Sequence, residues 1–184
     1  MAQVSAREDI VAKRPPCKHL KLEDFPEFSK GAKPPRRICG WMFDDSYMVA
    51  LAARRGLSFK PHKLNRHLFG GRETFKFSEL TEEHYQNEEL IQSLEYIALW
   101  KVLAYFASRT GTMLQVETAI SPKRKSVIVL WTNYNMGPTF ALYEGWREGG
   151  WKGVKQFLDD AMNECLPYGA ARSELLWWWP MKRS

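Results

Sequence analysis

The sequence predicts an α+β fold in which a small antiparallel sheet of two to four strands packs against a long helix and a second helix. Residues 82–109 have the apolar spacing of a long helix, residues 112–134 alternate like a β-hairpin, and residues 151–165 return to helical spacing. A hairpin between two amphipathic helices is typical of the α+β class, because each helix must bury its apolar side against another element.

The composition limits the class of protein. With 45% hydrophobic residues among 184, the chain can bury one sizeable core, which argues against disorder. The net charge of +6 is compatible with an anionic partner and also with plain solubility. Three cysteines are an odd number and favour free thiols. With no apolar leader at the start and no run of about 20 apolar residues, we expect an intracellular protein, cytoplasmic or nuclear, without a transmembrane segment.

The first 40 residues differ from the rest. Residues 1–40 contain the basic, proline-paired stretches KRPPCKHLK and KGAKPPRR. Proline restricts its own backbone and that of the preceding residue, so this segment is expected to be extended or turn-rich. We predict a basic N-terminal arm docked through Leu22, Phe25 and Phe28 onto a single domain, residues 41–184.

A short helix and an irregular connection come next. Residues 45–55 are predicted to be helical, with Asp44 or Asp45 as the N-cap. Residues 57–79 contain proline and a glycine pair, and predict an irregular connection with a short strand at 73–77. Long connections inside a domain often carry function.

The longest helical pattern is predicted to form the central helix, residues 82–109, with Thr81 as its N-cap. Between residues 96 and 107 only Lys101 interrupts the apolar residues, so this half is expected to be covered on more than one side, with Trp100 buried. One apolar stripe consists of Ile91, Leu94, Ala98, Val102 and Tyr105.

The strands of the sheet follow. Residues 112–120 and 126–134 alternate with period two and are joined by a short basic loop, so they predict a hairpin. Because two strands alone are marginal, a third strand is expected at residues 139–146. The chain has eight Trp. Three of them, Trp177–Trp179, either fold back and cap the core with alternate rings buried or form an interface.

Metal and cofactor binding are not predicted. Zinc sites place cysteine and histidine ligands in close pairs on tight turns. The spacing of the available residues matches none of the usual patterns, and no phosphate loop or dinucleotide-binding fingerprint is present. The residues weighed as ligands are Cys17, His19, Cys39, His62 and His67.

The preferred functional hypothesis is a binding protein that contacts an anionic partner, either nucleic acid or an acidic protein surface, through the basic arm and a basic loop. Phosphates attract Lys and Arg, and Phe59 and Phe69 are interleaved where aromatic rings can stack on bases. A charge run is equally typical of a solvated loop. The expected contact residues, predicted to share one face, are Arg54, Arg55, Lys60, Lys63, Arg66, Lys123, Arg124 and Lys125.

The alternative hypothesis is a small enzyme or small-molecule binder. It requires a pocket lined by Trp and Tyr in which acid–base side chains converge. The candidates for acid–base chemistry are Asp44, Asp45, His62 and His67. No nucleophile motif accompanies them, so the sequence leaves catalysis open, as it does the identity of the partner and the oligomeric state.

Overall fold

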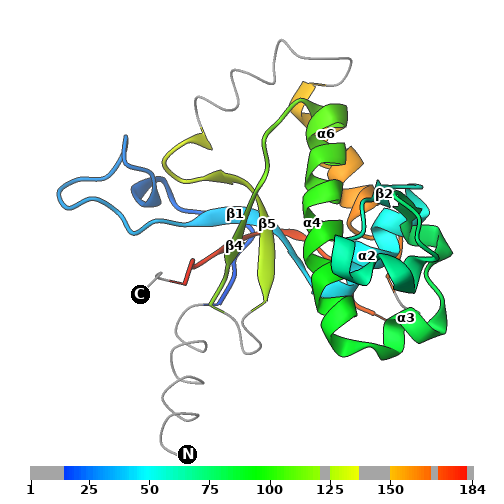
Figure 1. Cartoon of the computed structure of the whole chain (residues 1–184). Coiled ribbons are helices and arrows are strands. Elements are labelled where there is room, and N and C mark those ends of the chain that lie inside the picture. The colour runs from blue at the N-terminus through cyan, green and yellow to red at the C-terminus, as the bar shows by residue number, and fades with distance from the viewer. Residues whose placement is uncertain (1–14, 121–124, 137–149, 167–169, 182–184) are drawn as a thin grey trace, which may run out of the picture. The chain divides into compact units, whose positions relative to one another are not determined.

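A computed structural model describes residues 15–120, 125–136, 150–166 and 170–181. By their internal contacts the residues form two compact units. The sheet unit comprises Met1–Phe43, Leu114–Asn163 and Ala171–Ser184, and the helical unit comprises Asp44–Met113 and Glu164–Ala170. The predicted α+β class is confirmed by the sheets, the long helix and the shorter helices (Figure 1). The expected arm and single domain stay a prediction.

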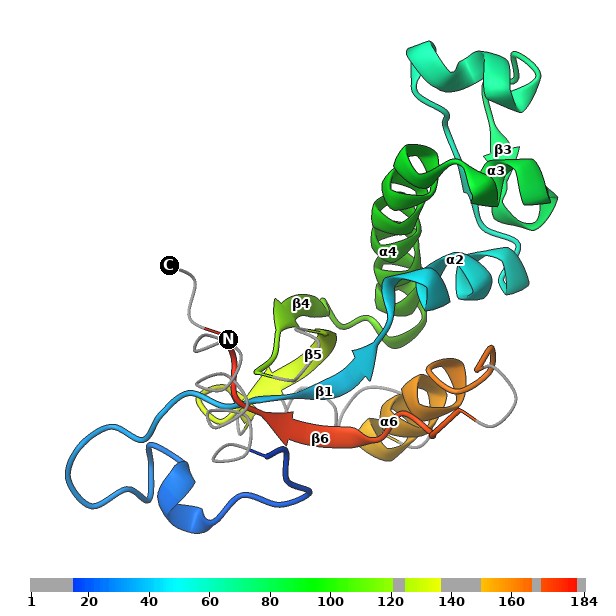
Figure 2. The same ribbon diagram turned by 90° about the horizontal axis from the view of Figure 1, so that it is seen from below.

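The sheet unit is built on a four-stranded antiparallel sheet with the strand order β4-β5-β1-β6. The predicted hairpin forms β4 (Gln115–Thr118) and β5 (Ser126–Thr132). Strand β1 (Ile38–Phe43) pairs with β5 on one side and with β6 (Leu175–Trp178) on the other, and Figure 2 shows β1 and β6 side by side. The strand expected at residues 139–146 lies outside the described residues.

Both faces of this sheet are apolar. Directly paired residues of antiparallel strands project from the same face, so the pairing of Ile38 with Trp178 assigns both to one face. Their buried neighbours there include Val127 and Val129. Cys39 pairs with Trp131 and with Trp177 on the other face. A strand covered on both sides needs no polar alternation, which explains the nearly continuous apolar sequence of β1.

The predicted second helix is observed as α6 (Gly150–Ala161). Leu158 and Ala161 are fully buried, as the helical spacing requires. Asp159 accepts a hydrogen bond of 2.7 Å from the indole nitrogen of Trp41, which ties α6 to β1. The helix therefore lies against the sheet face that carries Cys39 and Trp41.

Described residues before β1 are joined to the C-terminal strand. The backbones of Cys17 and Trp177 exchange two hydrogen bonds of 3.0 and 2.8 Å. The Phe25 ring meets the Trp177 ring edge to face, with centroids 6.1 Å apart. Trp177 and Trp178 are both buried, so these rings contribute to the core of the sheet unit.

The helical unit contains α2 (Asp45–Arg54), α3 (Glu82–Gln86) and α4 (Glu88–Thr110). The prediction of one continuous helix over residues 82–109 was wrong at Asn87. That residue adopts extended backbone angles, and its side-chain oxygen accepts a hydrogen bond of 3.0 Å from the amide of Leu90. Asn87 thereby caps a new helix, because an N-cap residue leaves helical geometry to satisfy a free amide.

Helix α4 buries one side and packs on α2. The buried side carries Leu90, Leu94, Ala98, Val102, Leu103 and Phe106. The prediction that residues 96–107 are covered on more than one side was wrong, because Tyr96 and Trp100 retain 64% and 56% of their accessible surface. Apart from Leu103, these buried residues recur four apart, and Trp100 falls two residues from Ala98, on a different side of the helix.

The connection between α2 and α3 is compact although it is irregular. It contains β2 (Ser58–Phe59), the 3₁₀ helix η2 (Lys63–Phe69), β3 (Phe75–Lys76) and the 3₁₀ helix η3 (Phe77–Glu79). The short strand expected near residues 73–77 corresponds to β3, which pairs with β2.

Candidate functional site

The basic loop, defined here as residues 60–68, begins in an extended segment and continues into η2. His62 is the N-cap of η2, and its ring nitrogen Nδ1 accepts a hydrogen bond of 3.4 Å from the amide of Leu64. Gly70 and Gly71 end the helix with positive φ angles of 63° and 74°, which glycine adopts at little cost. The loop thus has a defined conformation between a histidine cap and a glycine pair.

The two residues that flank the basic loop, Phe59 and Phe69, belong to a cluster of phenylalanine rings. The ring of Phe59 contacts those of Phe69, Phe75 and Phe77 at centroid distances of 5.4, 6.0 and 4.7 Å. Phe59 and Phe69 each expose only 2% of their surface. The expectation that these two rings stack on unpaired bases was therefore wrong, because a base must reach the face of the ring.

His84 fixes the position of the loop from the side of α3. Its ring stacks on Phe69 with centroids 5.1 Å apart. Nδ1 lies 3.0 Å from the amide nitrogen of Thr81, and Nε2 lies 3.1 Å from the carbonyl oxygen of Leu68. The Thr81 amide can only donate and the Leu68 carbonyl can only accept, so this geometry selects the neutral tautomer protonated at Nε2.

Two arginines predicted as contact residues are bound within the helical unit. Nε of Arg54 lies 2.9 Å from one carboxylate oxygen of Glu164, and Arg55 forms an ion pair with the other oxygen. Glu164 raises the pKa of the Arg54 guanidinium through this hydrogen bond. These arginines therefore have a carboxylate partner in their own unit.

The cations of the basic loop itself are freer to bind a partner than Arg54 and Arg55 are. Arg66 lies 3.8 Å from Glu73, at the limit of an ion pair. Lys60 and Lys63 are exposed and form no ion pair with any residue that the structure describes. Leu64, next to Lys63, exposes 77% of its surface, and this exposed leucine was not anticipated from the sequence. Its position in a basic, helix-breaking segment was the only available signal.

The hairpin tip belongs to the sheet unit. Lys123 and Arg124 lie outside the described residues, and Lys125 is half-buried. The carbonyl oxygen of Lys125 accepts a hydrogen bond of 3.2 Å from the amide of Ala119. That the tip and the basic loop share one face stays a prediction.

The residues of the alternative hypothesis occupy separate elements of the helical unit. Asp44 is the N-cap of α2 and Asp45 lies in its first turn, whereas His62 and His67 belong to the basic loop. Burial raises the pKa of Asp45, and the neighbouring Asp44 raises it further. Their assignment to acid–base chemistry stays a prediction.

The sheet unit contains a cleft of about 800 Å³ between α6, the sheet and the segment before β1. Its floor includes Cys39, Trp131 and Trp177, which are cross-strand neighbours. Burial raises the pKa of the Cys39 thiol well above its usual range, although a hydrogen bond with Trp131 opposes the shift. The charged residues that line the cleft are Lys18, Lys155, Asp159, Arg172 and Glu174, with His19 beside them.

Most of the cleft's charges are already balanced. Lys155 forms an ion pair with Asp159 one helical turn along α6. Lys18 lies 3.0 Å from Glu174. Arg172 is exposed, and no ion pair joins it to another described residue. The two carboxylates therefore neutralise Lys18 and Lys155, and the positive charge of Arg172 remains.

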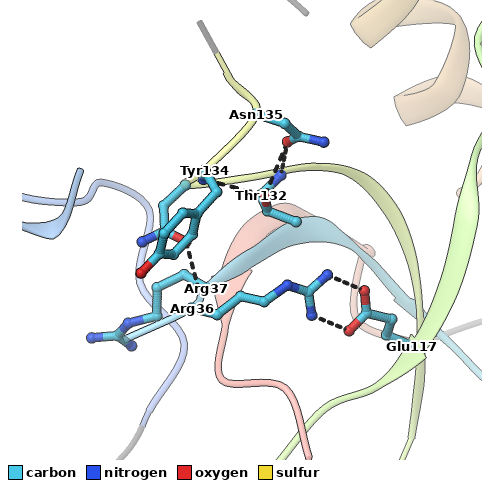
Figure 3. Close-up of polar contacts among 7 residues, drawn as sticks. Arg36, Arg37, Glu117, Thr132, Tyr134 and Asn135 are labelled. Carbon is cyan, nitrogen blue, oxygen red and sulfur yellow. Dashed lines mark hydrogen bonds and ion pairs between the residues drawn. The ribbon is translucent and has the colours of Figure 1, made fainter. Parts of the chain in front are cut away.

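The arm's arginines are also engaged inside the sheet unit. Both terminal nitrogens of Arg36 lie 2.5 Å from the carboxylate oxygens of Glu117, as Figure 3 shows. The backbone amide of Arg37 donates to Asn133 over 2.8 Å, and its guanidinium stacks over the Trp179 ring. The Tyr134 hydroxyl donates to the carbonyl oxygen of Pro34. These contacts join residues 34–37 to β4, to the residues that follow β5 and to Trp179, which follows β6.

All three cysteines are free thiols. Cys17 and Cys39 lie on either side of Trp177, so one strand separates them. In the described part of the chain, no three Cys, His, Asp or Glu side chains gather where they could hold a metal ion.

The chain was compared with models of known families, with curated proteins and with solved structures, and none of the three comparisons finds a match. Among the described residues, no helix combines the length and the apolar character needed to cross a bilayer.

Proposed function

We propose that this protein binds an acidic segment of another protein through the basic loop. The observation that carries the proposal is the combination of exposed Lys60 and Lys63 with the exposed side chain of Leu64. No acidic residue occurs between Arg54 and Arg72 in the sequence. Such a surface attracts a carboxylate-rich partner and offers it one apolar contact.

A protein partner fits this surface better than nucleic acid. Sequence-tolerant binding of single strands depends on aromatic rings that bases can stack on, and the phenylalanines of this region are buried. Leu64 and Leu68 instead expose aliphatic surface among the cations. An acidic amphipathic helix would place carboxylates against the lysines and its own apolar side against these leucines.

The phenylalanine cluster supports this proposal energetically. A loop that is ordered before binding loses less conformational entropy when a partner docks. Phe69 and His84 hold the carbonyl oxygen of Leu68 and the turn around it in place. The leucines are therefore presented on a supported turn.

A titration with two labelled probes tests the proposal. One probe is a synthetic peptide in which helical turns of Glu alternate with helical turns of Leu. The other is a single-stranded oligonucleotide of equal charge. K60E/K63E should lose most peptide affinity, and the salt dependence of its remaining binding should flatten. L64A should weaken the peptide without changing the salt dependence. K30E/K33E is the matched control, because it reverses two exposed lysines at the same spacing on the N-terminal segment.

Each outcome decides the matter. Retained affinity in K30E/K33E together with loss in K60E/K63E supports the loop. Equal loss in both variants means that net charge alone drives binding, which contradicts a site at the loop. Tighter binding of the oligonucleotide, unaffected by L64A, identifies nucleic acid as the partner and overturns the proposal.

Small-molecule binding in the cleft of the sheet unit is a second candidate function. The cleft has the volume of ordinary ligand sites, and Arg172 supplies a cation without a partner among the described residues. This combination favours an anion with an apolar body. The aromatic sulfonate 8-anilinonaphthalene-1-sulfonate is a suitable fluorescent probe. The R172E variant should bind the probe more weakly than the wild type does. The K152E variant, changed on the exposed side of α6, should bind it as the wild type does. Equal binding by all three proteins would exclude the cleft as the binding site.

A further inference from the structure

Strand β6 lies at one edge of its sheet, as Figure 2 shows, and its outer side has one open position. Successive residues of an antiparallel strand direct their N–H and C=O groups alternately to the two sides. Trp177 directs its groups away from β1, because they exchange hydrogen bonds of 2.8 and 3.0 Å with the backbone of Cys17. Leu175 precedes Trp177 by two residues, so its N–H and C=O also point away from β1.

Both neighbours of Leu175 on this outer side are satisfied. The side-chain oxygen of Asn163 accepts a hydrogen bond of 2.7 Å from the Ser173 amide, and its nitrogen donates to the Ser173 carbonyl oxygen over 3.0 Å. The backbone of Cys17 serves Trp177 in the same two ways. No hydrogen bond joins the outward backbone groups of Leu175 to any residue that the structure describes. One donor and one acceptor therefore stay available between two filled positions.

This gap opens into the cleft of the sheet unit. Leu175 and Trp177 both line the cleft, whose floor carries the Trp131 ring. Arg172 lines it as well, with a positive charge that no described carboxylate neutralises. The cleft therefore presents a backbone donor, a backbone acceptor, a cation and an apolar floor to one ligand. A residue of an extended peptide fits the first two, as Cys17 does beside Trp177.

We propose that the cleft binds an N-acylated apolar amino acid, the group that stands at the C-terminus of a peptide. Its amide N–H donates to the carbonyl oxygen of Leu175, and one carboxylate oxygen accepts from the Leu175 amide. The second carboxylate oxygen faces Arg172, and the apolar side chain covers Trp131. Sheet edges bind peptides in this manner, through main-chain hydrogen bonds and a pocket for a side chain. This ligand class rests on the second candidate function, because it requires the cleft to be a binding site.

Substitutions at Leu175 test the backbone contact in the whole chain. N-acetyl-L-phenylalanine is the probe, and its dissociation constant is measured by titration calorimetry. L175P removes the N–H, which the strand tolerates because this nitrogen points away from β1. L175A is the matched control, because it shortens the same side chain and keeps the N–H. L175P should bind the probe at least about tenfold more weakly than L175A, the usual effect of one hydrogen bond to a charged group.

Changes to the probe test the same contacts without altering the fold. N-acetyl-N-methyl-L-phenylalanine lacks the amide N–H and should bind the wild type about tenfold more weakly. N-acetyl-L-phenylalaninamide lacks the negative charge and should also bind more weakly. R172Q should abolish the preference for the acid over the amide, whereas K152Q, on the exposed side of α6, should keep it.

A longer probe separates the two sources of such a ligand. The peptide acetyl-Gly-Gly-Phe has the same last residue as N-acetyl-L-phenylalanine and extends further along the strand edge. Tighter binding of the peptide supports the proposal with a peptide C-terminus as the ligand. Equal binding supports it with the free acylated amino acid.

Each remaining result decides for or against the proposal. Weaker binding by L175P than by L175A, together with loss on N-methylation, supports it. Equal binding of the methylated and unmethylated probes overturns the pairing with Leu175, and this comparison holds even if circular dichroism shows that L175P does not fold. Absence of binding by the wild type overturns the ligand class. If the aromatic sulfonate still binds through Arg172 in that case, the second candidate function itself survives.

Discussion

The tryptophans of the sheet and the tryptophan of α4 occupy opposite environments. Trp41, Trp131, Trp177 and Trp178 are buried in the sheet unit. The indole N–H of Trp41 donates to Asp159, and that of Trp178 donates to the carbonyl oxygen of Gly40 over 3.1 Å. Trp100 is mostly exposed and contacts Tyr96.

The difference shows that apolar character alone does not place a tryptophan inside. A buried indole must satisfy its N–H, and the acceptor comes from α6 for Trp41 and from β1 for Trp178. Helix α4 has more apolar surface than its unit covers, so one side stays open. We therefore expect the sheet tryptophans to contribute more to stability than Trp100 does.

Replacing Trp41 by Ala should have the largest effect. Loss of a fully buried indole should lower the free energy of unfolding by about 3–5 kcal/mol. Trp41→Phe keeps most of the apolar volume and removes the bond to Asp159, so it should cost less, about 1.5–3 kcal/mol. Urea unfolding measures both. Similar stability of Trp41→Ala and wild type would contradict the burial of this ring.

The two sides of α4 provide the next comparison. Leu94→Ala on the buried side should cost about 2–5 kcal/mol. Trp100→Ala should cost less than about 1 kcal/mol, because exposed substitutions rarely change stability more. Urea unfolding measures both changes. Equal costs would mean that Trp100 is packed within its own chain.

Gly40 tests the close contact between β1 and β5. A Cβ atom at this position would lie 2.0 Å from the carbonyl oxygen of Ile128, so the strands would have to separate. We expect Gly40→Ala to cost about 1–3 kcal/mol or more by overpacking. Gly56→Ala is a comparison at a site with open space but a positive φ, where the cost comes from the backbone alone. Thermal unfolding that leaves Gly40→Ala unchanged would contradict the register of the two strands.

The smallest effect is expected at Glu95, on α4. Burial and then the charge of Asp45 raise the pKa of this carboxyl above its ordinary value of 4.5. The folded state therefore holds the proton more tightly, and the stability this provides is lost as pH rises through the folded pKa. Glu95→Gln should slightly stabilise the protein at pH 7, and the gain should vanish below pH 4.5. Glu89→Gln, at an exposed site, should give no gain.

Local pattern predicted much of the fold. The alternation in residues 112–134 gave the hairpin, and the apolar spacing of residues 151–165 gave α6. Of the two residues predicted as possible N-caps of α2, Asp44 and Asp45, the structure has Asp44. Asn87 followed by two glutamates is a cap signal that the longer helical pattern concealed.

The missed features depend on partners distant in sequence. Strands β1 and β6 are short apolar runs without a period, and what makes them strands is pairing across the sheet, of β1 with β5 and β6 and of β6 with β1. Periodicity correctly placed Leu94, Ala98 and Val102 on the buried side of α4, but the apolar residues around the helix concealed the exposure of Tyr96 and Trp100. Charge density located the basic loop, but the pairing of Arg54 and Arg55 with Glu164 requires the fold.

The discontinuity of the sheet unit has a consequence for synthesis on the ribosome. Strand β1 emerges first, but its neighbours β5 and β6 are translated only after the long segment Asp44–Met113, which forms most of the helical unit. That segment can begin to fold as it leaves the exit tunnel, since it contains most of the helical unit and compact units generally fold together. The nascent chain therefore carries β1 without its partners until β5 arrives, and one edge stays unpaired until the last strand is released. An open apolar edge is prone to pair with other chains, so chaperone attachment during translation should concentrate on this interval.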